Sequence, residues 1–153
     1  MGQGIEKNKF SLLGIPTSIK DLYGVNGYKT RAGTPKELPN KWEVQGPIVN
    51  TLTSHSSLIT GKTHTVEFAF GGVGMNPHWG TPINPWDEKN HRVPGGSSSG
   101  AGVSLCTGTA ALALGTDTAG SVRIPASVTG NVGLKTTKNR WSTGGIVPLL
   151  SLI

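Results

Sequence analysis

A stretch of small, uncharged residues covers positions 93–134 and restricts what this chain can fold into. Gly, Ser, Ala, Thr and Val make up most of it, and Asp117 and Arg123 carry its only charges. Small side chains at this density allow helices and strands to approach one another backbone to backbone. We therefore expect a closely packed segment in which the two opposite charges pair, because an isolated buried charge is costly.

The distribution of apolar residues predicts alternating strands and helices. We expect an extended stretch over 11–25, a loop over 26–45, a helix over 47–57, a short strand over 58–60, an irregular segment over 71–96, a helix over 100–110, a strand over 111–115 and a short helix from Ser121 onward. This alternation is typical of α/β architecture. An irregular segment as long as 71–96 is usually functional in a compact domain.

The overall composition excludes several classes of protein. The chain has 153 residues, with 14 Lys+Arg against 8 Asp+Glu, and its positive charges are scattered singly. Charge this sparse argues against nucleic acid as a direct partner. No apolar run is long enough for a membrane span, and residues 1–10 lack the apolar core of a signal peptide. The single cysteine, Cys106, excludes a disulfide framework and favours a cytoplasmic location.

The densest motif, Gly-Gly-Ser-Ser-Ser-Gly at 95–100, lies directly before the predicted helix 100–110. It is open to three interpretations: a flexible linker, a phosphate loop at a helix N-terminus, or a nucleophile elbow. A phosphate loop of the Walker type needs a lysine after its second glycine, and none follows here. A nucleophile elbow needs a histidine after the serine, whereas all four histidines lie upstream.

The histidines, at 55, 64, 78 and 91, do not have the spacing of a metal-ligand set. We expect them to be surface or loop residues. Neither a metal nor a cofactor is predicted.

Lysine can replace histidine as the base that activates a serine, and Lys20 is the candidate. It ends the largely apolar run 14–20. If Lys20 packs against the uncharged segment 93–134, desolvation lowers its pKa and leaves a neutral amine that can accept a proton. In the alternative interpretation Lys20 ends a strand and its amine reaches solvent.

The segment 115–125 places Ser121 in a glycine-containing turn after a predicted strand. Successive backbone N–H groups in such a turn can form an oxyanion hole. Asp117 and Arg123 bracket the turn and would hold it. The alternative is a structural salt bridge that closes an ordinary turn.

Five segments resemble, in the same order, motifs of the amidase signature family of serine hydrolases: 14–21, 61–68, 84–87, 94–100 and 115–125. The resemblance covers about 14–145. It implies an α/β fold with a mixed sheet core flanked by helices, and hydrolysis of a carboxylic amide C–N bond in a small molecule. Two alternatives remain: a glutaminase similar to the A subunit of glutamyl-tRNA amidotransferase, and a catalytically inactive truncated remnant.

The resemblance also implies a Ser-cisSer-Lys triad, in which Ser121 is the acyl-forming nucleophile, Ser97 the bridging serine and Lys20 the base. It places the oxyanion hole in the backbone N–H groups of Thr118, Ala119, Gly120 and Ser121, with Ala119 standing where many family members have glycine. Structural support is expected from Asp117, Arg123, Gly95, Gly96 and Ser98.

Members of that family are considerably longer than this chain. The resemblance therefore implies that residues 1–153 are a partial amidase domain, incomplete at both ends and lacking a C-terminal remainder. The apolar run 146–153 predicts association with a missing half or with another copy of the chain. We expect the isolated chain to be weakly stable and to have low or no amidase turnover.

Overall fold

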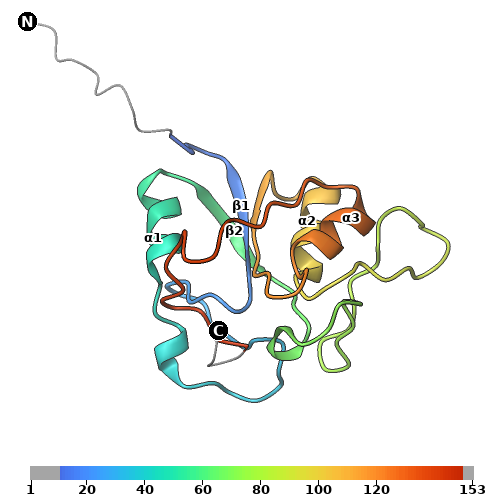
Figure 1. Cartoon of the computed structure of the whole chain (residues 1–153), viewed down its shortest axis with the longest axis horizontal. Coiled ribbons are helices and arrows are strands. Elements are labelled where there is room, and N and C mark those ends of the chain that lie inside the picture. Colours follow the sequence, from blue (N-terminus) through green and yellow to red (C-terminus); the bar gives the residue numbers. More distant parts are fainter. Residues whose placement is uncertain (1–10, 150–153) are drawn as a thin grey trace, which may run out of the picture.

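Three parallel strands lie at the centre of the computed structural model, which describes residues 11–149 (Figure 1). In space they are ordered β2-β1-β3, with bounds β1 (Pro16–Lys20), β2 (Leu58–Thr63) and β3 (Leu112–Leu114). Figure 1 shows one helix on one side of the strands and two on the other: α1 (Pro47–Ser54), then α2 (Ser99–Cys106) and α3 (Arg123–Thr129). Two 3-10 helices lie in the connecting segments, at Asn40–Trp42 and Glu67–Ala69.

The predicted order of strands and helices is confirmed, with shifted ends. β2 continues to Thr63, and the two 3-10 helices were not predicted. Helix α2 ends at Cys106 rather than at residue 110, because Gly108 adopts a left-handed φ of 71° just beyond it, which is a common way to end a helix. Helix α3 begins at Arg123 rather than Ser121, because residues 117–122 form a turn around Asp117.

Alternate residues of β1 point to opposite faces of the sheet. Ile19 belongs to the same apolar cluster as Val49 of α1. Ser18 points the other way, where its Oγ lies 2.9 Å from Ser104 Oγ of α2. Lys20 shares the face of Ser18, so its amine is directed toward the α2 side of the sheet.

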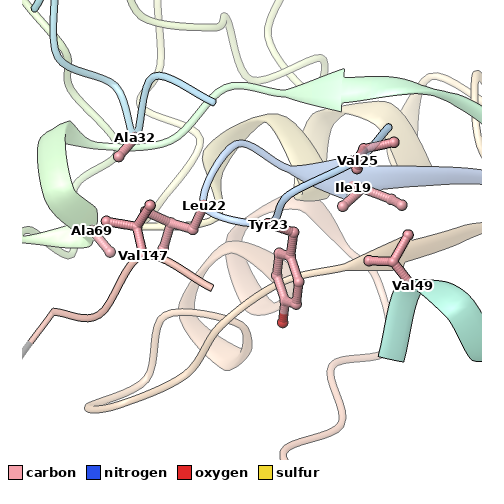
Figure 2. Close-up of a cluster of buried hydrophobic side chains, with 8 residues drawn as sticks. All are labelled: Ile19, Leu22, Tyr23, Val25, Ala32, Val49, Ala69 and Val147. Carbon is pink, nitrogen blue, oxygen red and sulfur yellow. The ribbon is translucent and has the colours of Figure 1, made fainter. Parts of the chain in front are cut away.

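One cluster of buried apolar side chains joins β1, the turn after it, α1 and the C-terminal segment. Figure 2 shows its members: Ile19, Leu22, Tyr23, Val25, Ala32, Val49, Ala69 and Val147. The Val147 N–H donates to the Leu22 carbonyl at 2.8 Å, and Tyr23 forms an antiparallel bridge with Ile146. The expected mixed sheet therefore appears as three parallel strands with one antiparallel bridge at the C-terminal segment.

The irregular segment 71–96 is confirmed, and two buried asparagines fix it. Asn76 Nδ2 donates to the carbonyls of Gly33 and Thr65. Asn84 Nδ2 donates to the Val128 carbonyl of α3 at 2.8 Å. These amide contacts hold the segment that leads into the Gly/Ser motif.

None of the helices within residues 11–149 has both the length and the apolar character needed to cross a bilayer. The expectation for residues 1–10, and the last four residues of the predicted apolar run, lie outside the described part of the chain.

Candidate active site

The candidate catalytic residues gather at the carboxyl end of the parallel sheet. Lys20 is the last residue of β1, and Thr116 and Asp117 follow β3. Ser97 lies just before the first turn of α2. Because the carboxyl ends of parallel strands meet at one edge of a sheet, residues that are far apart in sequence come together there.

The amine of Lys20 is buried and bound by two hydroxyl groups. Its Nζ lies 2.7 Å from Ser97 Oγ and 2.7 Å from Thr116 Oγ1, and the residue is 0% exposed. Desolvation by burial lowers the pKa of Lys20 to about 7, against a smaller opposing effect of the Asp117 charge. The amine is therefore buried, and the alternative of a solvent-facing amine is wrong. Near neutral pH, part of the Lys20 population is unprotonated and can accept a proton.

Ser97 lies in a turn that only glycine can build. The peptide bond between Gly96 and Ser97 is cis. A Cβ on Gly96 would lie 2.7 Å from the Gly71 carbonyl oxygen and 2.7 Å from the Gly74 nitrogen, so the backbone leaves no room for a side chain there. Gly95 has a φ of 74°, which also favours glycine. The predicted supporting role of both glycines agrees with this geometry.

Ser121 lies beside the Gly/Ser motif, but its hydroxyl does not bind Ser97 directly. The Ser98 N–H donates to the Ser121 carbonyl at 3.1 Å, which joins the two segments. Ser121 is half-buried and Ser97 is 0% exposed. Across the described residues, the Ser121 hydroxyl makes no hydrogen bond. A substrate can therefore approach Ser121, whereas Ser97 is enclosed.

The carboxylate of Asp117 organises the turn that carries Ser121. It accepts hydrogen bonds from the N–H groups of Gly120, Val122 and Arg123, and it lies 3.0 Å from the Arg123 guanidinium. Burial alone would raise the pKa of Asp117, but the Arg123 side chain and these backbone donors hold it well below its usual range. The predicted pairing of Asp117 with Arg123 is confirmed.

Three of the four N–H groups predicted to form the oxyanion hole are not already hydrogen-bonded within residues 11–149. The Gly120 N–H donates to Asp117 Oδ1 at 2.8 Å, so the expectation that Gly120 serves as an oxyanion donor does not match this geometry. The N–H groups of Thr118, Ala119 and Ser121 have no acceptor within residues 11–149. Three donors in the turn are therefore available for a developing negative charge.

Asp117→Asn is expected to lower the free energy of unfolding by about 3 kcal/mol, because it breaks the ion pair of a buried carboxylate and weakens three backbone hydrogen bonds. Urea unfolding of both proteins measures the loss. Asp87→Asn is the matched control, since Asp87 pairs with Arg92 at 2.9 Å on an exposed loop. We expect a much smaller loss there. Equal losses in the two variants would contradict a clamping role for Asp117.

Two residues that contact the site were missed by sequence reasoning. Thr116 binds Lys20, and the only signal for it is its place just after a predicted strand. That strand, β3, was expected to be buried, but its residues are exposed or half-buried. His64 was expected on the surface or in a loop. It does lie in the connection that follows β2, but it is half-buried there, and its Nδ1 lies 2.6 Å from Ser99 Oγ. Burial lowers the pKa of His64, which favours the neutral ring.

No three His, Cys, Asp or Glu side chains between residues 11 and 149 are grouped so that they could hold a metal ion. An open cavity of about 600 Å³ lies between residues 113–118 and the segment 134–149. Asp117 and Thr118 line it, but the candidate triad residues do not. The cavity is therefore separate from Lys20, Ser97 and Ser121.

Comparisons with known proteins agree with the geometry. A protein-family model described as Amidase matches residues 2–153. The 2-amino-5-chloromuconic acid deaminase of Comamonas testosteroni is 64% identical over 140 residues, which cover 92% of this chain and 30% of that protein. The A subunit of glutamyl-tRNA(Gln) amidotransferase from Cupriavidus metallidurans is 38% identical over 140 residues, covering 92% of this chain and 28% of that protein.

A solved structure described as an amidase superimposes with a TM-score of 0.83 and 42% sequence identity, covering 90% of this chain and 31% of that one. This likeness agrees with the α/β architecture. The chain spans about 30% of the length of the relatives that it matches.

Proposed function

The chain belongs to the amidase family, and from this premise we propose that it carries the catalytic serines and lysine of an enzyme that hydrolyses a carboxylic amide C–N bond. The observation that carries the proposal is the buried Lys20 amine, 2.7 Å from Ser97 Oγ. Ser121 attacks the amide carbon, the nitrogen leaves as an amine or ammonia, and water hydrolyses the resulting acyl-enzyme. The substrate is a small-molecule amide.

The proton path runs from Ser121 to Ser97 and from Ser97 to Lys20. Ser97 is enclosed, so it relays the proton and does not attack the substrate. For acylation the Ser121 hydroxyl turns toward Ser97, across the backbone hydrogen bond that joins Ser98 to Ser121. The protonated Lys20 then returns the proton through Ser97 to the leaving nitrogen, as microscopic reversibility of general acid–base catalysis requires.

The turn that carries Ser121 stabilises the negative charge of the tetrahedral intermediate. The free N–H groups of Thr118, Ala119 and Ser121 donate to the developing oxyanion. Asp117 and Arg123 hold this turn in place before substrate arrives, so little rearrangement is required during the reaction.

Intact mass after exposure to a fluorophosphonate tests the proposal. This probe requires a nucleophile, its proton relay and oxyanion donors, but little of a substrate pocket. We expect a single adduct, mapped by peptide mass to Ser121 and absent from Ser121→Ala. Ser127→Ala, which changes an exposed serine of α3, is the matched control and keeps the adduct. No adduct, or an adduct on Ser97, would contradict the assignment.

A second candidate function is favoured by the 64% identity to 2-amino-5-chloromuconic acid deaminase. In that case the whole protein releases ammonia from an amino-substituted acid rather than from a carboxamide.

Likeness to the A subunit of glutamyl-tRNA(Gln) amidotransferase supports a third candidate function: a glutaminase that passes ammonia to a partner. Ammonia release from 2-amino-5-chloromuconic acid, from glutamine and from simple carboxamides separates these substrates, and co-purification of a partner identifies the glutaminase.

A further inference from the structure

Thr116 is the second hydroxyl that binds the buried amine. Its Oγ1 lies 2.7 Å from Lys20 Nζ, the same distance as Ser97 Oγ. Two side-chain hydroxyls hold the backbone at Thr116 in place: Ser98 Oγ donates to the Thr116 carbonyl at 3.3 Å, and the Tyr23 hydroxyl donates to the Gly115 carbonyl at 2.7 Å. Thr116 is therefore fixed beside the amine as a partner separate from the relay serine.

We propose that Thr116 is a positioning residue for the base: its hydroxyl oxygen accepts one N–H of Lys20 and thereby keeps the nitrogen lone pair turned toward Ser97. The catalytic consequence of this contact rests on the proposed function, although the hydrogen bond itself does not. A neutral amine has two N–H donors and one lone pair, and it can rotate about its Cε–Nζ bond. A second acceptor restricts that rotation and leaves the lone pair for the Ser97 hydroxyl proton.

Other charged groups around Lys20 are few, so the effect of Thr116 can be isolated. Asp117, from the turn after β3, acts on Lys20 through its charge and is paired with Arg123. His64 at the end of β2 and Tyr23 after β1 both have pKa values shifted by burial toward their neutral forms. Helix α2 contributes no charged side chain. All of these groups are unchanged by a substitution at Thr116.

Direct titration of Lys20 in the 153-residue chain tests the proposal without requiring catalysis. The Cε signal of ¹³C-labelled lysine is followed by NMR and assigned by its loss in Lys20→Met. In Thr116→Val the ammonium form loses a hydrogen bond, so the pKa of Lys20 is expected to fall by about one unit. Thr116→Ser retains the acceptor and is expected to restore the wild-type titration. In parallel, we expect fluorophosphonate labelling of Thr116→Val to slow about tenfold at pH 8 and to recover in Thr116→Ser.

Thr17→Val is the matched control, because Thr17 is a buried threonine of β1 whose hydroxyl pairs with Ser57 on the opposite face of the sheet. It should lose stability but leave the pKa of Lys20 unchanged. If Thr116→Val does not fold, Thr116→Ala provides the same comparison. An unchanged Lys20 pKa in a folded Thr116 variant, or a failure of serine to restore it, would overturn the proposal. If Ser121 does not label while the Lys20 pKa still responds to Thr116, the proposed function fails and the positioning contact stands.

Discussion

Replacing Lys20 with methionine is expected to slow fluorophosphonate labelling of Ser121 by about a thousandfold, the scale of a lost general base. Methionine fills the apolar part of the site but offers no amine to accept the Ser97 proton. The chain should remain folded, because methionine removes the desolvation cost of the buried amine, and this offsets the hydrogen bonds lost with Ser97 and Thr116. Labelling rates by intact mass at pH 8, with urea unfolding of the same samples, measure both effects.

Lys62 offers a matched control on the neighbouring strand. It is a half-buried lysine whose pKa is also lowered mainly by desolvation, but its Nζ pairs with Asp21 at 2.7 Å. Lys62→Met leaves the Asp21 carboxylate without its partner, so it should lose stability and retain labelling. Lys20→Met is thus expected to lose labelling and keep its stability, whereas Lys62→Met is expected to lose stability and keep its labelling. If Lys62→Met slowed labelling as strongly as Lys20→Met, the assignment of Lys20 as the base would be wrong.

The stability of the chain is expected to rise with pH because of Lys20. The pKa of this lysine is about 7 in the folded chain, against an ordinary value of 10.5. Between these values the unfolded chain holds a proton that the folded chain has released, so raising the pH favours the folded state. From pH 7 to 9.5 the gain due to Lys20 is about 3 kcal/mol. Below pH 7 both states are protonated and this gain is absent.

Urea unfolding of wild type and Lys20→Met across this pH range isolates the effect. Lys62 contributes a change of the same sign in both proteins, so it cancels in the difference. Measurements stop at pH 9.5 because burial raises the pKa of Tyr23, which lowers stability at higher pH as the unfolded chain loses its tyrosine proton. If the free energy of unfolding changed with pH in the same way in both proteins, Lys20 would have an ordinary pKa in the folded chain.

Local sequence signals predicted the helices and strands, and the ion pair that holds the turn at 117–122, better than they predicted contacts between distant strands. The pairing of Asp117 with Arg123 followed from two charges in an otherwise uncharged segment. The apolar run before Lys20 left its burial open, with a solvent-facing amine as the alternative, and the family resemblance supplied Ser97 as its partner. These inferences use residue types and short spacings, which a sequence contains directly.

The contacts that sequence reasoning missed depend on how distant strands are aligned. Thr116 reaches Lys20 because β3 pairs in parallel with β1, with Ile19 opposite Leu114. His64 reaches Ser99 because β2 ends beside the first turn of α2. The hydrogen bond from the Gly120 N–H to Asp117 depends on the backbone path of the turn at 117–122. No local pattern fixes these alignments, so Thr116 and His64 looked like ordinary loop positions and Gly120 looked like a free donor.

The wide separation of the hydrogen-bonded residues has a consequence for how reactivity arises during folding. Lys20 is 77 residues from Ser97 and 96 residues from Thr116 along the chain. Contacts between such distant positions require large loops to close before any stabilising contact is gained. A locally folded helix or turn therefore cannot form the contacts of Lys20 with Ser97 and Thr116. If Ser121 is the nucleophile, as proposed above, its activation by Ser97 and Lys20 requires the parallel strands to have assembled first.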